Sequence, residues 1–171
     1  GMGPPSSGAI GVGQILGMIN KFPKGKIRDP QTLRLIGDAT RLAFADRGRY
    51  VADGDFVSVP TKELVEEQYL SKRASFLNRR NAIPVVTAGE PIASLTHRWA
   101  PDLSIDKPST TNVSIIDAYG NALSLTSSIE NAFGSRLMTN GFLLNNQLTD
   151  FSFRSSANGL SLIHISEPTR L

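Results

Sequence analysis

The sequence predicts an α+β fold in which helices come first and a β-hairpin follows. Within residues 1–77, apolar residues recur with the spacing of about 3.6 that places them on one face of a helix. After residue 109, two runs of β-branched and apolar residues flank a short turn, the pattern of two antiparallel strands. We therefore expect a helical region at 1–77, a linker at 78–109, the start of a sheet at 110–159 and a separate tail at 160–171.

The first helix is expected to begin at Ser6 or Ser7, because serine is a favoured N-cap residue. Its apolar residues are Ile10, Val12, Ile15, Leu16 and Ile19. Four glycines lie in the same stretch: Gly8, Gly11, Gly13 and Gly17. Glycine lowers helix propensity, so small residues at this spacing indicate close packing against another element.

A second helix is expected to begin at Asp29 and Pro30, since Asp caps a helix and Pro is tolerated in its first turn. Its predicted buried residues are Leu35, Ile36, Ala39, Leu42 and Ala43. Near its end lie Asp46, Arg47 and Arg49, which we interpret as a solvated or structural ion pair rather than as catalytic groups.

A third helix is expected from Pro60 through about Leu77. Its predicted buried residues are Leu64, Val65, Tyr69 and Phe76. Beyond residue 77 the periodicity stops and prolines become frequent, which indicates an extended linker up to Ser109.

The hairpin has a turn that sets its register. A three-residue loop at 118–120, with Gly120 in the positive-φ region, pairs Asp117 with Asn121. Counting outward from this pair places Thr110 opposite Ser128. Side chains alternate along a strand, so one face is crowded with short polar side chains where the first strand begins: Thr110, Asn112, Ser114, Ser124, Thr126 and Ser128. Hydroxyl residues on a solvated strand face are ordinary, so this pattern alone does not define a site.

Composition excludes several kinds of function. The net charge of +3 comes from dispersed basic residues without interleaved aromatics, so we expect no nucleic-acid partner. There is no cysteine, and His97 and His164 are the only histidines, so we expect no zinc cluster, no His-based triad and no cofactor. No apolar run is long enough to span a membrane.

Several ordered motifs resemble the γ-glutamyltransferase (glutathione hydrolase) family. They are residues 110–114 (TTNVS), Asp117, 120–122 (GNA), Phe133-Gly134, 143–147 (LLNNQ) and Asp150-Phe151. Upstream, residues 4–8 (PPSSG) and 45–47 (ADR) are similar to the C-terminal region of that family's heavy chain. The resemblance implies part of an αββα sandwich of the N-terminal-nucleophile (Ntn) hydrolases, with residues 110–159 as the start of the catalytic sheet in the light chain.

The same resemblance implies autoproteolysis of an inactive precursor between Ser109 and Thr110. The cut frees an α-amino group with a pKa of about 7.7 to 8.0, which serves as a general base for the Thr110 hydroxyl. The expected reaction is γ-glutamyl transfer from glutathione or another γ-glutamyl amide to water, an amino acid or a peptide. Heavy and light chains are expected to remain associated.

Further residues carry over one at a time. Ser128 matches a family Thr that hydrogen-bonds the nucleophile, while Gln147 and Asp150 match residues that hold the substrate's ammonium group. Glu130 stands where typical members have Asn; it could strengthen ammonium binding but would repel a nearby substrate carboxylate. Asn112 stands where family members commonly have His, and we assign no role to it. Two alternatives therefore stay open: an acylase acting on a different amide, and a processing-defective homologue without activity.

The two ends of the sequence bear on how much of such an enzyme is present. Residues 160–171 resemble the translation of a transposase-type sequencing adapter, so we expect a non-native tail. The family's carboxylate-binding Arg, its Ser-Ser pair and its Gly-Gly oxyanion element are not identifiable. We therefore expect a fragment that is inactive alone. Family members are often exported, which makes a periplasmic or extracellular location an expectation from the resemblance only.

Overall fold

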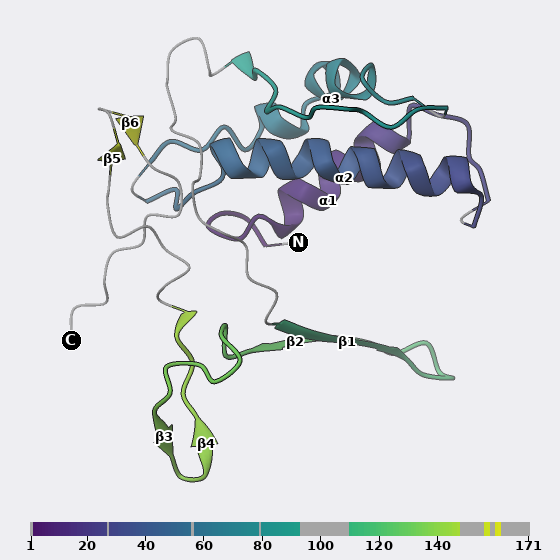
Figure 1. The fold of residues 1–171 in the computed structure, drawn as a ribbon. Helices are drawn as coiled ribbons and strands as arrows, with labels where there is room; N and C mark the ends of the chain where they lie inside the picture. Colours follow the sequence, from purple (N-terminus) through teal and green to yellow (C-terminus); the bar gives the residue numbers. More distant parts are fainter. Residues whose placement is uncertain are drawn as a thin grey trace. The chain divides into compact units, whose positions relative to one another are not determined.

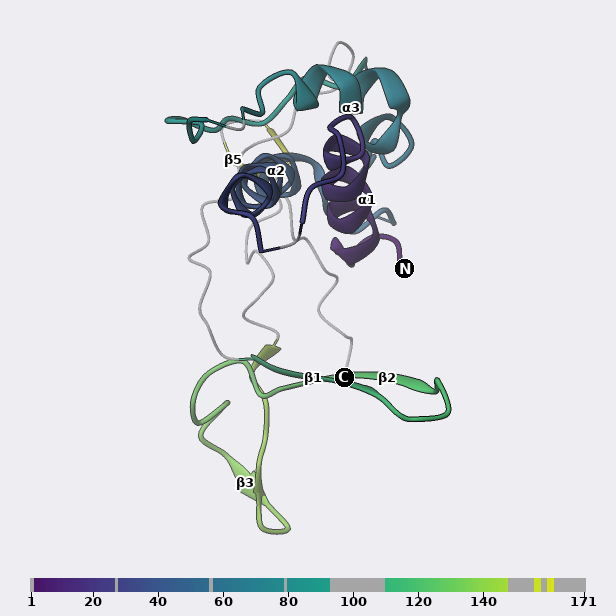
Figure 2. The same ribbon diagram turned by 90° about the vertical axis from the view of Figure 1, so that its right-hand side faces the viewer.

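The computed structural model describes residues 2–26, 28–55, 57–78, 80–92 and 110–147, and the backbone of 156–157 and 160–161. The chain divides into two compact units, one of residues 1–102 and 154–171 and the other of residues 103–153. The first contains the helices, and the second contains the first four strands (Figures 1 and 2). Each unit is described by itself.

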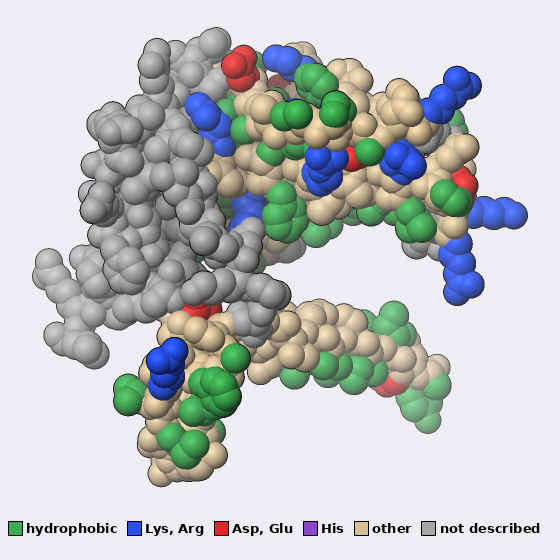
Figure 3. All heavy atoms as spheres, viewed as in Figure 1, with side chains coloured by type: hydrophobic (Ala, Val, Ile, Leu, Met, Phe, Trp, Pro, Cys, Tyr) green, Lys and Arg blue, Asp and Glu red, His purple; other side chains and the backbone are tan. Residues whose placement is uncertain are grey.

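The helical unit contains α1 (Gly8–Ile19), α2 (Pro30–Tyr50), the 3-10 helix η1 (Glu63–Val65) and α3 (Glu67–Ala74). Contacts join α1 to both α2 and α3, and Figure 2 looks nearly along the axis of α2. None of the helices in the described part of the protein combines the length and the apolarity needed to cross a lipid bilayer. Lys and Arg side chains are scattered over the face shown in Figure 3, as the dispersed basic residues of the sequence predict.

α1 begins after Ser7, as expected, but the Ser7 hydroxyl makes no capping hydrogen bond. Instead, Arg47 Nε donates to Ser7 Oγ at 3.1 Å. The buried residues of α1 are Ile10, Gln14 and Met18, whereas Val12 and Leu16 are exposed. The buried stripe is therefore narrow and includes a polar residue that apolar patterning alone does not reveal.

The start of α2 is confirmed, with Asp29 as N-cap and Pro30 in the first turn. Four of the five predicted core residues are buried, and Ile36 is half-buried. The same helix also buries three residues that were not predicted as core: Asp38, Asp46 and Tyr50.

The prediction of one continuous third helix is wrong. Glu66 is extended, with φ −68° and ψ 143°, and separates η1 from α3. This break changes the helical phase, so Val65 and Phe76 are exposed, while Leu64 and Tyr69 are buried as predicted.

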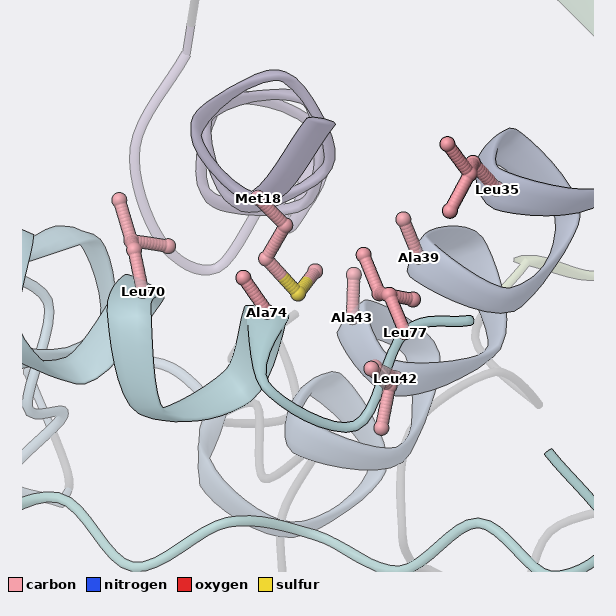
Figure 4. Packing of buried hydrophobic residues seen from close by; sticks show 8 residues of the cluster. All are labelled: Met18, Leu35, Ala39, Leu42, Ala43, Leu70, Ala74 and Leu77. Carbon is pink, nitrogen blue, oxygen red and sulfur yellow. The ribbon is translucent and has the colours of Figure 1, made fainter. Parts of the chain in front are cut away.

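The main core joins side chains from all three α-helices (Figure 4). Its members are Met18, Leu35, Ala39, Leu42, Ala43, Leu70, Ala74 and Leu77. A Cβ on Gly17 would overlap the side chain of Leu70, and a Cβ on Gly13 would touch Val65. The prediction of close packing from the small residues of the first helix is therefore confirmed at these two positions.

A buried carboxylate organises the second half of this unit. Asp46 Oδ1 forms an ion pair with Arg73 Nη2 at 3.0 Å and accepts the N–H of Gly89 at 2.7 Å. Asp46 Oδ2 accepts from Gln14 Nε2 at 3.0 Å and from the Tyr69 hydroxyl at 2.9 Å. Burial raises the pKa of the Asp46 carboxyl above its usual value, and the Arg73 charge and the hydrogen bonds oppose this effect. The structural ion pair expected near the end of this helix exists, but its cation is Arg73.

This network holds residues 80–92, the first part of the predicted linker, against α2. Arg73 Nη2 donates to the carbonyls of Leu42 and Thr87, both at 3.0 Å. The Tyr50 hydroxyl donates to the Gly89 carbonyl at 2.5 Å. The segment is thus bound through its backbone, although its sequence carries no periodic pattern.

The second unit consists of two small antiparallel sheets. β1 (Thr110–Ile116) pairs with β2 (Ala122–Ser128), and β3 (Met138–Thr139) pairs with β4 (Phe142–Leu143). In the other unit, β5 (Ser156–Ala157) pairs with β6 (Leu160–Ser161), where the predicted tail begins. The order of helices followed by antiparallel strands confirms the α+β class. The non-native origin of the tail stays a prediction.

Candidate functional site

The β1–β2 turn has the geometry that its sequence predicts. Gly120 has φ +86°, and the Asp117 N–H donates to the Asn121 carbonyl at 3.0 Å. Asp117 Oδ1 accepts the backbone N–H groups of Tyr119 at 2.9 Å and Asn121 at 2.8 Å. The Asn121 side chain also donates to Asp117, and this bond holds the pKa of the Asp117 carboxyl below its usual value. The turn therefore fixes the pairing of the two strands from a few neighbouring residues.

The resulting register brings the two predicted catalytic hydroxyls together. Thr110 is directly opposite Ser128 in the β1–β2 ladder. Thr110 Oγ1 donates a hydrogen bond to Ser128 Oγ at 3.1 Å. The pairing counted outward from the turn is thus confirmed, and the side chains make the contact that this pairing allows.

Asn112, to which the sequence assigned no role, continues this polar face. Its side-chain amide donates to Thr126 Oγ1 at 3.0 Å, and its Oδ1 accepts from Ser114 Oγ at 3.1 Å. Asn112 and Thr126 form the ladder pair two positions along from Thr110 and Ser128. A second cross-strand bond between polar side chains therefore lies next to the hydroxyl pair on the hairpin.

Glu130 lies two residues beyond Ser128 and has a left-handed backbone, with φ 68°. The residue is buried, at 8% exposure. Its N–H donates to Ser128 Oγ at 3.0 Å. The Ser128 oxygen therefore accepts hydrogen bonds from both Thr110 and Glu130, which orients the Ser128 side chain.

The segment that leads to Gln147 is bound back onto the residues around Glu130. The Asn146 N–H donates to the Ile129 carbonyl at 3.3 Å, and the Asn131 N–H donates to Asn146 Oδ1 at 3.1 Å. The structure shows hydrogen bonds to the residues on both sides of Glu130.

Gln147 has a buried side-chain oxygen, Oε1, that accepts no hydrogen bond from the described residues. A buried amide oxygen without a donor is unfavourable, and it offers an acceptor to an incoming N–H group. Ser109 and Asp150, the other predicted residues of the cleavage site and the substrate site, lie outside the described residues. His97 and His164 also lie outside them.

The described residues contain no group of three or more His, Cys, Asp or Glu side chains arranged to hold a metal ion. The hydrogen bonds of this region bring together two hydroxyls and the backbone N–H of Glu130, and the nearby sequence adds the buried residue Glu130 and the buried carboxamide oxygen of Gln147.

Comparison with known proteins agrees with the family resemblance of the sequence motifs. The family model described as gamma-glutamyltranspeptidase matches residues 1–170. The glutathione hydrolase proenzyme of Bacillus subtilis (strain 168) is 32% identical over 158 residues, covering 86% of this chain and 27% of that protein. The acylase ACY 1 proenzyme of Pseudomonas sp. (strain V22) is 30% identical over 153 residues, covering 86% of this chain and 25% of that protein. A solved structure of cephalosporin acylase from Bacillus halodurans aligns with TM-score 0.60 at 20% identity, covering 85% of this chain and 24% of that one.

The helices and the antiparallel strands define an α+β protein, and its fold is similar to that of the cephalosporin acylase. More narrowly, the chain belongs to the γ-glutamyltranspeptidase family. It spans about a quarter of the length of the curated relatives that it matches.

Proposed function

We propose that the protein containing this chain is a γ-glutamyltransferase and glutathione hydrolase that is activated by autoproteolysis between Ser109 and Thr110. The observation that carries the proposal is the 3.1 Å hydrogen bond between Thr110 Oγ1 and Ser128 Oγ at the first residue of β1. A threonine at the start of a strand, paired with a second hydroxyl, suits the nucleophile of an Ntn hydrolase. The heavy chain would end at Ser109, and the light chain would begin at Thr110.

The first step is self-cleavage. The Thr110 hydroxyl adds to the Ser109 carbonyl, the Ser109–Thr110 peptide bond breaks, and the acyl group moves from the nitrogen to Oγ1. Water then hydrolyses this ester and leaves a free α-amino group on Thr110. Both the B. subtilis relative and the acylase ACY 1 relative are named as proenzymes, which agrees with a precursor that must be cut.

In the transfer step, the new amino group accepts the proton of Thr110 Oγ1 as this oxygen attacks the γ-carbonyl of the substrate. The departing amine takes a proton, and an acyl-enzyme ester remains on Thr110. Water releases glutamate, or the amine of an amino acid or peptide forms a new γ-glutamyl amide. Before its proton moves to the amino group, Thr110 Oγ1 donates it in a hydrogen bond to Ser128 Oγ, which orients the oxygen that will attack.

In this proposal, Gln147 and Asp150 recognise the donor substrate by binding its α-ammonium group. Gln147 Oε1, which accepts no hydrogen bond within the described part of the protein, is an acceptor suited to such an N–H donor, and Asp150 would add a charge-assisted bond. Glutathione and other γ-glutamyl amides carry this ammonium group. The heavy and light chains would remain associated after the cut.

Mass spectrometry of the complete gene product tests the proposal. Wild type and Thr110→Ser should yield two chains that meet between Ser109 and Thr110, while Thr110→Ala should remain one polypeptide. The cut protein should release glutamate from a γ-glutamyl anilide. An intact wild-type polypeptide would instead support a non-catalytic homologue.

An acylase that acts on a different amide is the second candidate. It is favoured by the carboxylate of Glu130, which is unsuited to a neighbouring substrate carboxylate, and by the 30% identity to the acylase ACY 1 proenzyme. A protein that is cut at Thr110 but releases no glutamate from the anilide would support this candidate.

A further inference from the structure

Asn146 connects the segment that contains Gln147 to the residues around Glu130. It is half-buried, it precedes Gln147, and it follows β4 by three residues. Through its N–H it donates to the Ile129 carbonyl at 3.3 Å, and through Oδ1 it accepts from the Asn131 N–H at 3.1 Å. These two bonds bracket Glu130 from its preceding and following residues.

Glu130 has a backbone conformation that glutamate rarely adopts. Glu130 has φ 68°, and a left-handed backbone is unfavourable for any residue with a Cβ. Such a conformation persists only where surrounding contacts maintain it. The Asn131 N–H is shared between Asn146 Oδ1 and the Ile129 carbonyl, so the amide of Asn146 completes the bonding of this turn.

The peptide group between Ile129 and Glu130 connects this turn to the nucleophile. Its carbonyl accepts from the N–H groups of Asn146 and Asn131, and the N–H in the same plane, that of Glu130, donates to Ser128 Oγ at 3.0 Å. The same oxygen accepts from Thr110 Oγ1 at 3.1 Å. If the turn opened and this peptide group rotated, the Glu130 N–H would turn away from Ser128, and the Ser128 hydroxyl would lose one of the contacts that orient it.

We propose that Asn146 is a positioning residue for the Thr110–Ser128 hydroxyl pair, acting through the backbone of Glu130. This inference rests on the proposed function, in which Thr110 is the nucleophile. Asn146 does not touch the reacting atoms; its carboxamide maintains the turn whose N–H orients Ser128.

A second contact in the same loop keeps Asn146 within reach of this turn. The Ser135 N–H donates to the Leu144 carbonyl at 2.9 Å. A Cβ on Gly134, which has φ +51°, would overlap that carbonyl. The backbone entering Asn146 is therefore held close to the backbone leaving Glu130, and the side chain of Asn146 spans the remaining distance.

The test compares three variants of the complete gene product. Asn146→Leu removes the acceptor at similar size, Asn146→Asp retains an acceptor oxygen, and Asn145→Leu is the matched control on an exposed neighbour. We expect Asn146→Leu to slow self-cleavage and to lower kcat on a γ-glutamyl anilide by about tenfold to a hundredfold, since small misplacements of reacting groups have effects of this size. KM should stay within about twofold, Asn146→Asp should recover most of the loss, and Asn145→Leu should behave as wild type.

Three outcomes would overturn the inference: unchanged rates in Asn146→Leu, a raised KM with unchanged kcat, or an equal loss in Asn145→Leu. A second measurement separates this inference from the proposed function. In the uncut Thr110→Ala background, Asn146→Leu should speed hydrogen exchange of the Glu130 and Asn131 amides by about tenfold or more while α2 amides are unchanged, because the turn opens locally. Unchanged exchange would contradict the inference even if the wild type proved inactive, whereas an inactive wild type with faster exchange would refute only the function.

Discussion

Thr110 and Ser128 share a hydrogen bond of 3.1 Å at the open end of the β1–β2 ladder, the end farthest from the turn. The turn and this bond are joined by seven successive residue pairs. Any change that shifts the register by one residue would therefore separate the two hydroxyls and place one of them on the opposite face.

Ser128→Ala is expected to slow both self-cleavage and turnover by about tenfold, because it removes one hydrogen bond to the nucleophile. Ser128→Thr should retain activity, since it keeps the hydroxyl. Rates of precursor processing and of glutamate release from a γ-glutamyl anilide provide the measurement. Equal activity of the Ala and Thr variants would show that the bond does not contribute.

Glu130→Gln is expected to lower KM for a γ-glutamyl donor by about fivefold, because it removes a buried negative charge from a site that must accept the donor's α-carboxylate. The backbone N–H that bonds Ser128 is unchanged, so self-cleavage should continue at its normal rate. Steady-state kinetics with the anilide measure the effect. A raised KM would show instead that Glu130 binds the ammonium group.

Asp46→Asn is expected to destabilise the 171-residue protein by about 3–5 kcal/mol, since Arg73, only 3% exposed, would keep a buried charge without its partner. Lys21→Ala is the control, because Lys21 and Glu67 form an ion pair with side chains 28% and 76% exposed. Its cost should be about 0–1 kcal/mol. Urea unfolding followed by circular dichroism compares the two, and equal losses would contradict the role assigned to the buried pair.

Stability should decline in alkali through Tyr69. Burial, aided by the Asp46 carboxylate, raises the pKa of the Tyr69 hydroxyl above its usual value of 10.0. A group whose pKa is higher in the folded state contributes stability that is complete below the unfolded pKa and is lost as pH rises through the folded one.

The urea concentration at the midpoint of unfolding should therefore be lower at about pH 11 than at about pH 9 for the wild type. The decrease should be smaller for Tyr69→Phe. Tyr50 also has a raised pKa, so some alkaline loss should remain in the variant. Parallel urea titrations at the two pH values decide the matter. An equal decrease of the urea midpoint in wild type and variant would exclude Tyr69 as a source of the loss.

Sequence patterns predicted the features that depend on near neighbours. The pairing of Thr110 with Ser128 follows from Asp117 and Gly120, because a turn of a few residues determines every pair beyond it. The start of α2 follows in the same way from Asp29 and Pro30. The family motifs identified the hydroxyl pair and Gln147 as candidates before any geometry was known.

Contacts between distant segments were not accessible to such reasoning. Arg47 is the nearest cation to Asp46 along the sequence, yet Arg73 pairs with it, since helix packing rather than sequence distance brings charges together. The break at Glu66 and the bonds of Asn146 around Glu130 likewise depend on what packs against each segment. Local turn and cap chemistry is thus determined by adjacent residues, whereas burial, charge pairing and left-handed strain arise only when separate parts of the protein meet.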